Sequence, residues 1–204
     1  MDISILNHLF LLIFPFIIIS FFILLSILNA DMKGIIYLIG LTVSLLFTYL
    51  IGNNFSLFNY LTNANEICNN ISIKHISYNL PINQNVIGYT LSYLLYSSII
   101  SRLLTDKNNN KIWESGSIIN AFIDNIYLIV FFIAILIFDV IWNIQNSCFN
   151  FSQLLISIIL GSTIGLLWGY IISTSNSKYL QYLTNNNYCA TPKKKAFKCK
   201  KSKK

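Results

Sequence analysis

The chain has 204 residues, of which 55% are hydrophobic and only 10% are charged. A soluble globular domain carries about 25% charged residues, so this composition excludes an ordinary soluble protein and indicates a bilayer as the solvent. The formal net charge of +7 is concentrated at the carboxyl end, because eight of the fourteen basic residues lie between Lys193 and Lys204.

Apolar run length predicts an all-α, polytopic membrane protein with about five transmembrane helices, since a helix needs about 20 residues to cross the hydrocarbon core. The runs cover residues 6–28, 34–52, 85–104, 118–143 and 153–174. The third is the most polar, with Ser92, Ser97 and Ser98 inside it. We therefore expect a transmembrane domain over residues 1–178, with an outer Asn-rich loop at about 53–84, and a basic tail over residues 179–204 on the interior side.

The basic residues predict the orientation. With the amino terminus outside, the interior side holds all of them except Lys74, as the positive-inside rule requires. The carboxyl terminus is then cytoplasmic or interior. An even number of spans would put one basic cluster on the wrong side.

Two ladders of small residues at four-residue spacing predict close helix packing, because small side chains let helix backbones approach where lipid gives no hydrophobic drive. The ladder in the second span is Gly40, Ser44, Thr48 and Gly52; that in the fifth is Ser157, Gly161, Gly165, Gly169 and Ser173. Their partner can be another helix of the chain or a second copy in a homo-oligomer.

Two acidic residues, Asp124 and Asp139, lie in the fourth span, where ionisable groups are costly and suggest function. Each is also near a span end, where a carboxylate can reach interfacial water. We expect no metal site, no cofactor and no complete catalytic motif.

The cysteines fall on two sides. Cys68 and Cys148 lie in outer loops and can form a disulfide if that side is oxidising, or remain free thiols. Cys189 and Cys199 lie in the interior tail, where two cysteines alone do not make a zinc site.

The tail can contact anionic lipid headgroups or nucleic acid, or act only as a topology signal. Its candidate binding residues are Lys193, Lys194, Lys195, Lys198, Lys200 and Lys201.

The segment around Cys189, Pro192, Phe197 and Cys199 resembles the carboxyl-terminal signature of small multi-spanning membrane proteins of large icosahedral DNA viruses. Leu80-Pro81-Ile82-Asn83 and the glycine-rich last span extend this resemblance over roughly residues 79–199. It implies residence in a membrane beneath a capsid, with membrane or capsid proteins as partners, and no catalytic role.

A second resemblance is to type 2 phosphatidic acid phosphatases, through Pro81 and the pair Gly161 and Gly165. Where that family has its histidine, aspartate and arginine, the chain has Gln153, Ser157 and Ser147. A phosphoenzyme mechanism needs a nucleophile and a base, so the resemblance implies an inactive relative.

The sequence thus favours a structural membrane protein of a viral inner membrane. We expect its basic tail to dock on an acidic surface. A degenerate or active lipid phosphate phosphatase-like enzyme is one alternative. A small-solute or ion channel or carrier is another, because the third span is polar enough to line a path.

Overall fold

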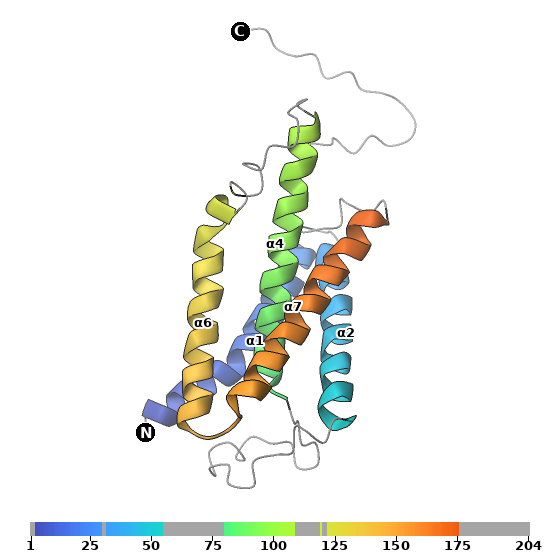
Figure 1. The fold of residues 1–204 in the computed structure, drawn as a ribbon. Coiled ribbons are helices and arrows are strands. Elements are labelled where there is room, and N and C mark those ends of the chain that lie inside the picture. Colours follow the sequence, from blue (N-terminus) through green and yellow to red (C-terminus); the bar gives the residue numbers. More distant parts are fainter. Residues whose placement is uncertain (1–2, 30–31, 55–79, 109–118, 120–121, 176–204) are drawn as a thin grey trace.

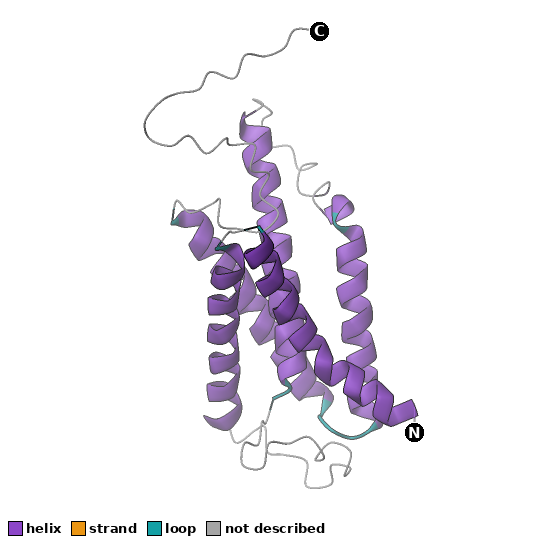
Figure 2. Cartoon of the chain, turned by 180° about the vertical axis from the view of Figure 1, so that it is seen from behind, coloured by secondary structure: helices purple, strands orange, loops and turns teal. Residues whose placement is uncertain are grey.

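The computed structural model describes residues 3–29, 32–54, 80–108, 119 and 122–175, and the described part is helical almost throughout. Its five long helices are α1 (Ile3–Leu28), α2 (Lys33–Asn54), α4 (Ile82–Asn108), α6 (Ile126–Gln145) and α7 (Phe151–Thr174). Figure 1 shows them as one bundle in which the chain direction alternates, so that α1 begins and α7 ends at opposite ends. Figure 2 shows short turns and no strand in the described part. The predicted all-α class is confirmed.

Four of these helices are long and apolar enough to cross a membrane: α1 over Leu9–Leu28, α2, α6 and α7. Their mean hydropathies run from 2.0 to 3.0. Large apolar side chains cover their outer faces, such as Phe16, Leu46 and Leu167, which are 64%, 61% and 59% exposed. An apolar surface of this extent requires a bilayer around it. The chain is therefore a multi-pass membrane protein.

The fifth helix, α4, is not in that group, and its position explains why. It contacts each of the other four helices, most extensively α7. Every residue from Gln84 to Thr90 is buried, so this stretch meets protein on all sides. A helix enclosed in this way does not need an apolar surface. The polar character of the third predicted span thus follows from its central place in the bundle (Figure 1).

The fourth predicted span, residues 118–143, differs from the observed helix. The continuous helix α6 begins only at Ile126. Before it, the backbone N–H of Asn125 donates to the carbonyl of Phe122 at 3.2 Å, which is a tighter turn than an α-helix. The side chain of Asn125 donates to Ser98 Oγ of α4 at 2.6 Å and holds the break in place. Asp124 therefore precedes α6.

The predicted outer loop at 53–84 is shorter at both ends than expected. Helix α2 continues to Asn54, and α4 begins at Ile82, directly after Pro81. Proline favours the start of a helix, because its fixed φ suits the first turn and no N–H is lost. Residues 55–79 of the loop and the tail at 179–204 lie outside the described residues.

An aromatic cluster fills the centre of the bundle. Phe22 of α1 packs on Tyr37 of α2 with ring centroids 4.1 Å apart, and Tyr37 lies 5.5 Å from Tyr89 and 5.7 Å from Tyr93 of α4. All four rings are buried. Two tyrosine hydroxyls of the cluster are hydrogen-bonded as well: Tyr37 Oη shares a 2.7 Å hydrogen bond with Thr90 Oγ1, and Tyr89 Oη donates to the carbonyl of Tyr37 at 3.0 Å. The interior is packed with side chains.

Candidate functional site at the start of the central helix

The first turn of α4 carries three consecutive amide side chains, Asn83, Gln84 and Asn85. Successive residues of a helix point about 100° apart, so three neighbours inside a bundle face three different surroundings. Each of the three makes hydrogen bonds to a different helix. We call these residues the amide run.

Asn85 binds α2. Its Oδ1 accepts from Ser44 Oγ at 2.9 Å, and its Nδ2 donates to Thr48 Oγ1 at 2.6 Å. Thr48 Oγ1 in turn donates to the carbonyl of Ser44 at 3.0 Å. All three side chains are buried. The ring of bonds satisfies the amide and both hydroxyls, as buried polar groups require.

Gln84 binds α6. Its Nε2 lies 2.5 Å from Oδ2 of Asp139, and Oδ1 of the same carboxyl group accepts from Asn143 Nδ2 at 3.1 Å. Asn83 also reaches this carboxyl group, and its Nδ2 donates to the carbonyl of Leu11 in α1 at 3.2 Å. The carboxyl group of Asp139 thus lies among three amides at the junction of α1, α4 and α6.

The two acidic residues have opposite surroundings. Asp139 is 1% exposed, although it lies only six residues, or about 9 Å at 1.5 Å per residue, from the end of α6. Its place near a helix end would have allowed contact with interfacial water, but the amides enclose it instead. Asp124 is exposed. Of the two candidates, only Asp139 lies in the interior.

The ladder of α7 packs directly on α4. Ser157 Oγ donates to the carbonyl of Pro81 at 2.5 Å. A Cβ added at Gly165 would lie 2.6 Å from the carbonyl oxygen of Tyr89, and one at Gly161 would lie 3.0 Å from the carbonyl carbon of Asn85. The distance at Gly165 is shorter than real Cβ contacts allow, and at Gly161 the carbonyl oxygen of Asn85 would lie closer still than its carbon. The small residues are therefore needed where the two helix backbones meet.

The ladder of α2 faces the same central helix. Gly40 lies against Tyr89 of α4 and Trp168 of α7, and Gly52 lies against Leu80 at the entry to α4. Ser44 and Thr48 bind Asn85, as described above. Between the two predicted partners, the structure brings both ladders onto helices of the same chain, and neither ladder is left facing outward.

The three positions compared with the phosphatase motif stabilise or shape the local backbone at the start of α4 and α7. Gln153 Oε1 accepts from the backbone N–H of Asn150 at 2.8 Å and caps the start of α7. Ser157 binds Pro81, and Ser147 adopts a φ of 54° in the turn between α6 and α7. Among the described residues, no group of three or more His, Cys, Asp or Glu side chains is placed to hold a metal ion.

Cys148, in the turn before α7, is disulfide-bonded, and its partner lies outside the described residues. The pairing with Cys68 therefore stays a prediction. Cys68, the tail signature of Cys189, Pro192, Phe197 and Cys199, and the tail lysines also lie outside the described part.

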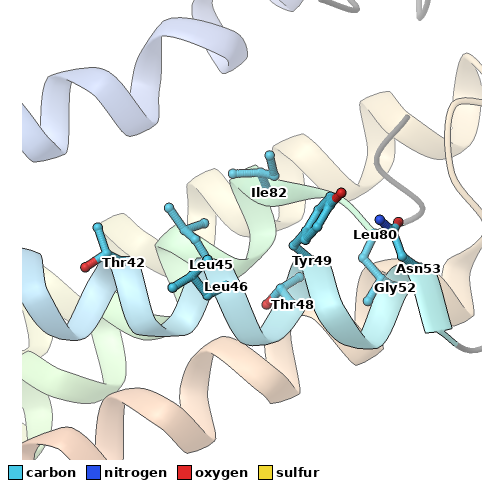
Figure 3. Close-up of a pocket in the computed structure, with 9 residues that line it drawn as sticks. All are labelled: Thr42, Leu45, Leu46, Thr48, Tyr49, Gly52, Asn53, Leu80 and Ile82. Carbon is cyan, nitrogen blue, oxygen red and sulfur yellow. The ribbon is translucent and has the colours of Figure 1, made fainter. Parts of the chain in front are cut away.

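A groove of about 390 Å³ lies between α2 and the start of α4. Figure 3 shows its lining, which consists of Thr42, Leu45, Leu46, Thr48, Tyr49, Gly52, Asn53, Leu80 and Ile82. None of these side chains is a carboxylate, a cation or a histidine. Its mostly apolar lining is suited to contact with hydrocarbon.

Sequence reasoning missed Gln84, Asn85 and Asn143. Asparagine is abundant throughout the chain, which hides a functional amide among ordinary ones. Their position in the sequence could have identified them. Three consecutive amides at the start of a membrane span are costly unless each finds a hydrogen-bond partner.

These features define an all-α, multi-pass membrane protein built around a polar central helix. No protein-family model matches the chain, and comparisons with curated proteins and with solved structures find no match either.

Proposed function

We propose that the chain is a structural membrane protein of a viral inner membrane, and that its basic tail docks on an acidic surface at the interior side. The observation that supports a structural role is that the interior side chains of the bundle hold its helices together. The amide run and both small-residue ladders join α4 to its neighbours, and the aromatic cluster fills the space that remains. A bundle joined in this way is suited to act as a rigid element in a bilayer.

The viral and docking parts of the proposal rest on the sequence. The tail signature between Cys189 and Cys199 supports the viral assignment, and the eight lysines from Lys193 onward support docking. Each basic residue near an anionic membrane contributes about 1 kcal/mol of attraction. The orientation, with the amino terminus outside and the tail inside, follows from the positive-inside rule.

The docking part is tested on the full-length chain in nanodiscs of zwitterionic lipid. We expect binding of both anionic vesicles and duplex DNA, and competition between them identifies the preferred surface. A variant with the six candidate lysines changed to glutamine should lose this binding, whereas Lys33→Gln, at the start of α2, should keep it. If the unaltered chain binds neither ligand at physiological salt, the docking proposal is wrong.

The viral part is tested by location. We expect the protein in purified virions at a stoichiometry comparable to that of capsid components. A trace amount confined to host membranes would contradict a structural role in the particle.

A carrier is the second candidate function, and a single observation favours it. A carboxyl group enclosed within a bundle, as at Asp139, is a frequent feature of ion and proton pathways. Ion flux through proteoliposomes that is lost in Asp139→Asn would support the carrier over the structural protein.

A further inference from the structure

Among the described residues, no positively charged side chain pairs with the buried carboxyl group of Asp139. Its side-chain hydrogen bonds in the described part of the chain are to the amides of Gln84 and Asn143, and the amide of Asn83 lies beside it. Amides are neutral, so they orient the carboxyl group without balancing its charge. A charged carboxylate buried within a membrane-spanning bundle is costly. A positive partner would remove this cost.

A second group at the same place also lacks a partner. Gln84 is fully buried, and its Oε1 accepts no hydrogen bond in the described part of the structure. This oxygen belongs to the amide whose nitrogen contacts Asp139 Oδ2, so it is close to the carboxyl group. A buried acceptor left unsatisfied is costly, and such groups often mark a bound ion or a reactive centre.

We propose that Asp139 and Gln84 form a binding site for one small monovalent cation, either a proton or Na⁺, inside the bundle. Carboxylate and amide oxygens are hard ligands that suit such a cation. A single carboxylate balances a single positive charge, which favours a monovalent ion over a divalent one. The site requires neither the basic tail nor a viral membrane, so it goes beyond the proposed function.

No charged group of the described residues is hydrogen-bonded around Asp139. The groups hydrogen-bonded around Asp139 come from α1, α4 and α6, and in the described residues they are amides and a backbone carbonyl, none of them ionisable. Asn83 is half-buried, whereas Gln84, Asp139 and Asn143 are buried. Asn83 therefore marks the side from which a cation can enter, at the end of the bundle where α4 begins.

The test is infrared difference spectroscopy on the full-length chain in lipid nanodiscs. A protonated carboxyl group gives a carbonyl band that a carboxylate lacks. We expect an Asp139 signal that changes between acidic and alkaline buffer. If the cation is only a proton, added NaCl has no effect beyond that of KCl; if it is Na⁺, NaCl removes the band at constant pH and KCl does not.

Two variants and a control test whether the infrared signal and the cation site belong to Asp139 and Gln84. Asp139→Asn should abolish the signal, and Asp124→Asn, at an exposed carboxyl group, should keep it. Gln84→Leu should keep the signal and weaken Na⁺ binding roughly tenfold, which corresponds to about 1.4 kcal/mol, because the ligand Oε1 is lost. It should also shift the pH midpoint of the band, because the Nε2 donor to the carboxylate is lost. An unaltered protein in which no Asp139-dependent band responds to pH or to Na⁺ overturns the proposal. An unchanged midpoint in a folded Gln84→Leu protein removes Gln84 from the site.

Discussion

Enlarging Gly165 tests the tight contact between α4 and α7. A Cβ at this position would lie 2.6 Å from the carbonyl oxygen of Tyr89, against an ordinary contact of at least 3.4 Å, so the helices must separate by about 0.8 Å. The obstacle is backbone in a buried turn of α4 and cannot rotate away. Overpacking costs about 1–3 kcal/mol, and alanine recovers up to about 1 kcal/mol of helix propensity.

We therefore expect Gly165→Ala to destabilise the bundle by about 0–2 kcal/mol, and Gly165→Leu by several kcal/mol. The matched control is Ala134→Leu, which adds the same side chain on an exposed position of α6 and should be close to neutral. Reversible unfolding in mixed micelles measures the free energy of each variant. Equal stability of Gly165→Leu and Ala134→Leu would refute the packing argument, as would equal behaviour of Gly165→Leu and the conservative Leu166→Ile.

The other predictions address the polar contacts, the termini, the disulfide and catalysis. Asn85→Leu should cost about 1–3 kcal/mol in the same unfolding assay, because two interhelical hydrogen bonds are lost, whereas Asn53→Leu, at an exposed position, should cost little. Protease or thiol probes in sealed vesicles should find the two termini on opposite sides; equal protection would contradict an odd number of spans. Cys68→Ser should remove the reduction-sensitive gel shift that we expect from a bond to Cys148, and an unchanged shift would assign the partner elsewhere. Purified protein should release no phosphate from phosphatidate, and a release abolished by Asp139→Asn would instead indicate an enzyme.

The helices and their packing residues could largely be predicted from the sequence, because both depend on local patterns. Apolar run length is visible in one dimension, and so is a four-residue ladder such as the one through Gly161 and Gly165. What such a ladder does not specify is its partner, since small residues permit close approach to any helix. Only the tertiary arrangement shows that α2 and α7 both use their ladders against α4.

The break before α6 and the burial of Asp139 could not be predicted, because both depend on side chains from other helices. Asn125 interrupts the helix without a proline or a glycine, and the interruption is held by Ser98 from a different helix. Asp139 lies near a helix end, which is compatible with water contact. Its burial depends on Asn83 and Gln84 of α4, more than fifty residues earlier in the chain. Both features arise from contacts between distant segments.

The central place of α4 also has a consequence for how the bundle forms. Its amide run is expensive in hydrocarbon until each member finds a partner, and the partners are on helices that precede and follow it in the chain. Asn85 is satisfied by α2, which is made earlier, but Gln84 needs Asp139 of α6. The carboxyl group of Asp139 is equally costly without these amides. The two polar elements therefore stabilise each other only when α4 and α6 pack together, so the membrane-embedded fold is completed by the later helices.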